Sequence, residues 1–113
     1  MNTSKRTDAI VERLYGFLQL PPNWDSYGAV PTHRGAVEAA RAHIEAVGDA
    51  PYEAVPIPDG GVQINWRGPV LSLEIEARPD GSLSCYLPHV DVAAGNALVR
   101  LILEDRLAIA GEK

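Results

Sequence analysis

A chain of 113 residues, 46% of them hydrophobic and 22% charged, is long enough for one domain with its own core and too apolar to be disordered, so we expect a single domain over residues 1–113. It contains no run of about twenty apolar residues, so no membrane-spanning helix is expected. The ten basic residues are spread along a chain of net charge −5, which argues against nucleic-acid binding.

The N-terminal segment and the cysteine content set an expectation for the cellular compartment. The first ten residues are polar and lack the apolar stretch of a secretory signal. Cys85 has no second cysteine with which to form an internal disulfide or a zinc site. We therefore expect a cytoplasmic protein without a cofactor or a bound metal.

Two helices are predicted in the N-terminal half. Ile10, Leu14 and Phe17 share one helical face, which predicts an amphipathic helix over about residues 4–20, and two consecutive prolines then open a loop over residues 21–31.

The second helix is predicted over about residues 32–47. Thr32 is a suitable N-cap, and Gly48 follows at a position where a left-handed residue commonly ends a helix.

Residues 53–88 change to a period of two, which predicts four strands joined by short turns and hence an antiparallel meander. One face of this sheet is apolar and the other polar, and Cys85 belongs to the apolar face. The three turns are Asp59-Gly60-Gly61, Gly68-Pro69 and Pro79-Asp80-Gly81.

A third helix, predicted over about residues 91–110, is unusually apolar. Its hydrophobic residues form two adjoining stripes, which cover more of its surface than one packing contact uses. The helix therefore either packs centrally between the sheet and the other helices or presents an interface, as in a homodimer. Together the elements predict an α+β domain with two N-terminal helices, a four-stranded sheet and a C-terminal helix, all helices on one sheet face.

The loop over residues 21–31 carries two large aromatic side chains and is the first candidate site. In a structural interpretation, Trp24 and Tyr27 pack against the sheet and Asp25 accepts backbone hydrogen bonds. In a functional one, Trp24, Asp25 and Tyr27 contact a protein partner, because aromatic residues dominate binding hot spots. The structural interpretation is favoured for Trp24, and both stay open for Tyr27.

The polar face of the predicted sheet is the second candidate site. Arg67, Glu74, Glu76 and Tyr86 belong to this face and suit salt-sensitive recognition of a protein. A solvated sheet face has the same pattern, so both interpretations stay open.

No catalytic or metal-binding constellation is evident in the sequence. His33, His43 and His89 lack a metal-ligand spacing, so we expect surface or helix-capping histidines. Ser26 is not on the strand-to-helix turn that surrounds a nucleophilic serine, which argues against a triad with Asp25 and His33.

Two motifs carry a resemblance to other proteins. The loop motif NWDSYGA at residues 23–29 and the strand motif DGGVQINW at residues 59–66, followed by LEIE at residues 73–76, resemble a group of small, uncharacterised bacterial and phage-associated proteins. The resemblance implies a microbial origin and brings no activity or catalytic residue with it.

These features together favour a small, acidic, non-enzymatic protein-binding module, such as an inhibitor of the antitoxin, immunity or phage anti-defence type. Two alternatives stay open. One is a small-molecule-binding protein or hydrolase that uses the Trp24 to Tyr27 loop with His33, and the other is a homo-oligomeric accessory protein that uses the helix over residues 91–110.

Overall fold

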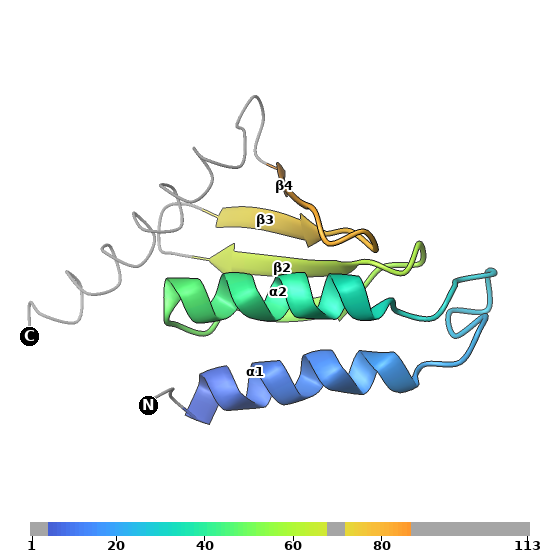
Figure 1. The fold of residues 1–113 in the computed structure, drawn as a ribbon, viewed down its shortest axis with the longest axis horizontal. Coiled ribbons are helices and arrows are strands. Elements are labelled where there is room, and N and C mark those ends of the chain that lie inside the picture. Colours follow the sequence, from blue (N-terminus) through green and yellow to red (C-terminus); the bar gives the residue numbers. More distant parts are fainter. Residues whose placement is uncertain (1–4, 68–71, 87–113) are drawn as a thin grey trace, which may run out of the picture.

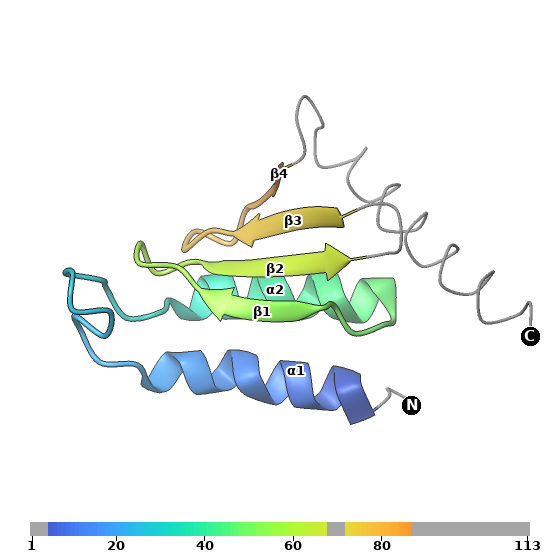
Figure 2. The same ribbon diagram turned by 180° about the vertical axis from the view of Figure 1, so that it is seen from behind.

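A computed structural model of the chain describes residues 5–67 and 72–86, in which two helices pack on one face of a four-stranded antiparallel sheet (Figures 1 and 2). The predicted α+β class and the antiparallel meander are confirmed, whereas the helix predicted over residues 91–110 lies outside the described residues. The strands run in the order β1-β2-β3-β4, with bounds β1 Glu53–Pro56, β2 Val62–Arg67, β3 Ser72–Ala77 and β4 Leu83–Tyr86.

The first helix is shorter than its apolar pattern predicts. Helix α1 spans Lys5–Gly16, and a 3-10 turn, η1, continues the chain over Phe17–Gln19. Leu20 then adopts an extended conformation (φ −68°, ψ 133°), as expected of a residue that precedes a proline. The two prolines therefore fix where the helical segment ends.

Helix α2 spans Arg34–Val47, and its N-cap is His33. The prediction of Thr32 as the N-cap is wrong, because the backbone N–H of His33 is held by the carbonyl of Gly60 in the β1–β2 turn, at 2.9 Å. This contact keeps His33 extended, so that its own ring Nδ1 accepts the N–H of Gly35 at 3.1 Å. Gly48 ends the helix in the left-handed conformation (φ 82°), as predicted.

The strand register places alternate residues on opposite sheet faces. Ile64 lies opposite Ile75, and Trp66 opposite Leu73, on the face that the helices cover. Cys85 is half-buried against the same core, which confirms its predicted inward phase. The apolar residues on strands and helices thus meet because the sheet period of two and the helix period of 3.6 each present one continuous face.

The two helices pack against different strands of the sheet. Helix α2 packs against β2 and β3, whereas α1 runs antiparallel to α2 and lies along β1 (Figures 1 and 2). The guanidinium Nε of Arg13 on α1 donates to the carbonyl of Ala54 in β1 at 2.8 Å, and Pro56 offers no N–H, so this edge has few groups free for further strand pairing.

No helix among residues 5–67 and 72–86 is long and apolar enough to span a membrane. The core comprises Leu14, Phe17, Ala36, Val37, Ala40, Ile44, Ala54, Val62, Ile64, Trp66, Leu73, Ile75 and Ala77.

Candidate functional site

The loop over residues 21–31, here named the aromatic loop, connects α1 to α2 and lies beyond the ends of both helices (Figure 1). Its backbone closes on itself, because the N–H of Asn23 donates to the carbonyl of Ala29 at 2.7 Å. The side-chain Oδ1 of Asn23 accepts the N–H of Gly28 at 2.7 Å. Asn23 (φ 64°), Ser26 (φ 69°) and Gly28 (φ 88°) all have positive φ, which asparagine and glycine tolerate best. The short loop motif therefore folds into one specific closed turn.

Asp25 organises the centre of the aromatic loop. Its Oδ1 accepts the backbone N–H of Tyr27 at 2.8 Å and that of Ala29 at 3.0 Å. The buried Ala29 fixes this part of the loop against the body of the protein. Asp25 therefore accepts backbone hydrogen bonds within the loop, as its structural interpretation predicts.

The aromatic loop is also attached to the sheet. The N–H of Val30 donates to the carbonyl of Pro58 in the β1–β2 turn at 2.9 Å. The indole Nε1–H of the half-buried Trp24 donates to the carbonyl of Val30 at 3.0 Å. The Trp24 indole donor is therefore satisfied within the aromatic loop itself.

Tyr27 differs from its neighbours in the aromatic loop, because 91% of its surface is exposed. Its backbone N–H is fixed by Asp25, while its ring extends into solvent. An exposed tyrosine on an ordered loop offers a large apolar ring and a phenol hydroxyl, which is the chemistry of a binding hot spot. Of the two aromatic residues that the sequence singled out, Tyr27 is the one whose ring is exposed to solvent, so its predicted packing against the sheet is wrong.

The polar sheet face forms a separate surface. Register places Glu53, Asn65 and Glu74 in one row across three strands. The Nδ2 of Asn65 donates to Glu53 Oε2 at 2.8 Å, and the Nε2 of Gln63 donates to Asn65 Oδ1 at 3.2 Å. Glu74 and the neighbouring Glu76 are half-buried. This face is thus a partly hydrogen-bonded polar surface.

Arg67 lies at one end of the polar sheet face, with its guanidinium carbon 3.8 Å from the centre of the Tyr52 ring. The sequence did not indicate this cation–π contact, because Tyr52 precedes β1 and lies outside the alternating pattern of that strand. Tyr86, the fourth residue predicted on this face, ends β4, and its side chain lies outside the described part of the structure. The structure does not bring this surface together with the aromatic loop, which lies beyond the opposite end of β2.

The geometry required of a catalytic triad is not assembled in the aromatic loop. The Nδ1 of His33 accepts a backbone N–H from Gly35, so the same nitrogen cannot donate to a carboxylate. The Oδ1 of Asp25 is engaged by two backbone amides. The role of His33 as a helix cap confirms the prediction for that residue.

Hollows of about 600, 570 and 360 Å³ occur between α1 and α2, between α1 and β1, and on the polar sheet face. None of these three is lined by a residue of the aromatic loop, so they do not support a ligand pocket beside it. Within residues 5–67 and 72–86, no group of three or more His, Cys, Asp or Glu side chains is arranged to hold a metal ion.

His43 and Trp66 form a polar contact inside the core. The indole Nε1–H of Trp66 donates to Nε2 of His43 at 2.9 Å, and His43 is only 7% exposed. The prediction of a surface or capping role is therefore wrong for His43, whereas His89 lies outside the described residues. The helical spacing gave a usable signal, since His43 follows Ala40 by three residues and so falls on the inner face of α2.

Comparison of the chain with protein-family models, curated proteins and solved structures finds no match. The microbial origin implied by the motif resemblance therefore stays a prediction.

Proposed function

We propose that this protein is a small, non-enzymatic protein-binding module that presents Tyr27 on the aromatic loop to a partner protein. The observation that carries the proposal is the 91% exposure of Tyr27 on a loop whose backbone is fixed on both sides of it. Inhibition of the partner, as by an antitoxin or immunity protein, is the form of binding proposed from the acidic charge and small size of the chain.

Preorganisation supports this role. A flexible loop loses conformational freedom when it binds, and this loss weakens the complex. The hydrogen bonds of Asn23 and Asp25 hold the aromatic loop in one conformation before any partner arrives. Burial of the Tyr27 ring in a partner's pocket would then contribute about 2 kcal/mol or more, as tyrosine hot spots do.

The charge distribution predicts how such a complex responds to salt. Asp25 is the one charged residue between positions 20 and 32, although the chain as a whole has a net charge of −5. A contact centred on Tyr27 would therefore depend little on salt, whereas a contact through Arg67, Glu74 and Glu76 on the polar sheet face would weaken as salt rises. Salt dependence thus distinguishes the two candidate surfaces.

The test is affinity purification of the tagged protein from its native host, followed by calorimetric titration of the purified partner. Tyr27→Ala should weaken binding about 25-fold or more, which corresponds to about 2 kcal/mol. Tyr52→Ala is the matched control, because Tyr52 is also exposed (51%) but lies against Arg67. Glu74→Arg tests the polar sheet face.

A partner whose affinity falls in Tyr27→Ala and is kept in Tyr52→Ala and Glu74→Arg would support the proposal. A partner lost only in Glu74→Arg would move the binding site to the polar sheet face. The absence of any stoichiometric partner would refute the binding function.

A further inference from the structure

The buried contact between His43 and Trp66 joins α2 to β2. The two rings meet edge to face, with centroids 5.7 Å apart and an interplanar angle of 76°. Because an indole N–H can only donate, Nε2 of His43 must accept and therefore carries no proton. The imidazole is thus neutral in the folded protein, with its proton on Nδ1.

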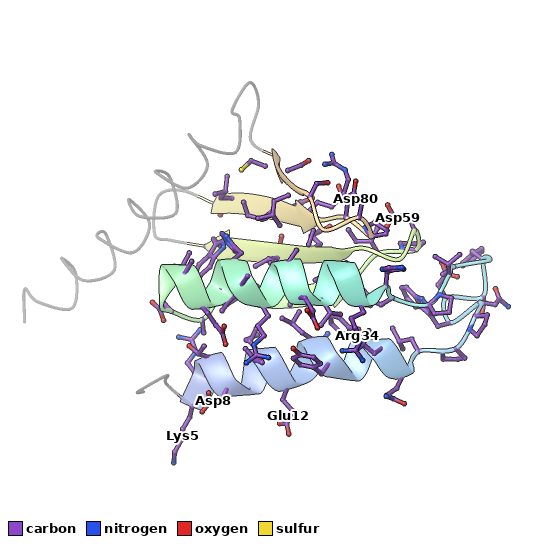
Figure 3. The ribbon with its side chains drawn as sticks, in the orientation of Figure 1. Lys5, Asp8, Glu12, Arg34, Asp59 and Asp80 are labelled. Carbon is purple, nitrogen blue, oxygen red and sulfur yellow. The ribbon has the colours of Figure 1, made fainter. Side chains whose placement is uncertain are left out.

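The charged groups of the helices around this pair are directed elsewhere. On α2, Arg41 and Glu45 pair with each other at the surface, at 3.0 Å. On α1, Arg13 donates to a carbonyl of β1 and lies over the ring of Phe17. Lys5, Asp8 and Glu12 of α1 are exposed (Figure 3) and line the open hollow that this helix forms with Arg41 and Glu45 of α2.

The charged groups of the sheet do not reach the pair either. Glu74 and Glu76 alternate with the buried residues of β3 and so lie on the opposite sheet face. Arg67 follows Trp66 directly and lies over the ring of Tyr52. Burial is accordingly the cause that lowers the pKa of His43 below its ordinary value, with no carboxylate among the described residues to stabilise an imidazolium.

We propose that His43 is a pH-sensitive latch between α2 and the sheet, which opens when its ring is protonated. Protonation places an N–H on Nε2 directly opposite the N–H of Trp66, so that two donors face each other within the core. It also places a positive charge in a buried, apolar environment. Acidification should therefore loosen the packing of α2 on β2 while the neutral form holds it.

The sign of the pH dependence follows from the number of bound protons. In the unfolded chain the imidazole of His43 has its ordinary pKa of about 6.5. In the folded protein the pKa of His43 is lower, because burial disfavours the protonated ring. The folded state therefore binds fewer protons than the unfolded state at mildly acidic pH. Stability contributed by the contact is complete above about pH 6.5 and is lost as the pH falls from there toward the lower pKa of the folded state.

The test compares urea unfolding of the wild-type protein with that of His43→Gln between pH 8 and pH 4.5. The glutamine Oε1 can accept the Trp66 N–H near the position of Nε2 but does not titrate, and all other titrating groups are shared. Below about pH 6.5, the ratio of unfolded to folded wild-type molecules should rise relative to the variant by up to tenfold per pH unit, the limit for one proton. Parallel curves for the two proteins would overturn the proposal.

A measurement on the wild-type protein keeps the test valid if the variant does not fold. Nitrogen-15 NMR of the His43 ring should show Nδ1 protonated and Nε2 unprotonated at neutral pH, with a titration midpoint below 6.5. A midpoint at or above 6.5, or a proton on Nε2 at neutral pH, would refute the latch. Neither result depends on whether Tyr27 binds a partner.

Discussion

Replacement of Asp25 by alanine removes the acceptor that two backbone amides of the aromatic loop share. The exposed amide of Tyr27 can bind water instead, but Ala29 is buried, and a buried unsatisfied N–H costs about 1–3 kcal/mol. We therefore expect Asp25→Ala to lower the free energy of unfolding by about 1–2 kcal/mol. The same change should weaken binding of a partner several-fold although Tyr27 is retained, because the loop must then be ordered on binding.

Urea unfolding measures the stability change, and amide hydrogen exchange locates it. Exchange at Ala29 should accelerate in Asp25→Ala, while Asp25→Asn, which keeps the Oδ1 acceptor, should lose much less protection. Glu38→Ala removes an exposed carboxylate that pairs with Arg34 at 3.6 Å, so it serves as a control expected to change stability by less than about 1 kcal/mol. Unchanged exchange at Ala29 in Asp25→Ala would refute the role assigned to this carboxylate.

Three further predictions concern the body of the fold and are checked by urea unfolding. Leu14→Ala should destabilise the protein by about 2–5 kcal/mol, because Leu14 is fully buried between the helices and the sheet; a loss below about 1 kcal/mol would contradict this packing. Gly35→Ala should destabilise the protein, because the new Cβ would lie 2.5 Å from the carbonyl oxygen of Pro79. Gly16→Ala should stabilise the protein by about 0.5–1 kcal/mol, because Gly16 has a helical φ and open space around it. Equal effects of the two changes on the free energy of unfolding would show that the crowding at Gly35 is absent. Arg13→Ala should cost about 0.5–1.5 kcal/mol and increase self-association in light scattering, because it uncovers the β1 edge; an unchanged scattering profile would indicate that another group protects this edge.

Local sequence patterns were sufficient for most of the described fold. The alternation of apolar and polar residues along β2 and β3 requires an antiparallel arrangement with one covered face, since each strand has a period of two and the connections are short. Gly48 ends α2 for a local reason as well, because its positive φ is accessible to glycine. Such features depend on neighbours within a few residues, so one sequence is enough to predict them.

The candidate site was only partly predictable. The sequence drew attention to Trp24, Asp25 and Tyr27 together, but only the folded loop separates them into a satisfied indole, a carboxylate that holds the backbone and an exposed ring. The proximity of Arg67 to Tyr52 likewise depends on how β1 pairs with β2. Exposure is a property of the packed molecule, which is why the pattern alone left the role of Tyr27 open.

The clearest contrast between sequence and tertiary structure lies in the histidines. Composition, periodicity and turn residues by themselves determined an acidic α+β domain with a meander sheet, because these signals are local and repeated. The tertiary structure alone decided that His33 rather than Thr32 caps α2, since Gly60 of a distant turn fixes its N–H, and that His43 is buried. A buried imidazole is stable only if a partner satisfies it, and that partner, Trp66, lies 23 residues away in the chain.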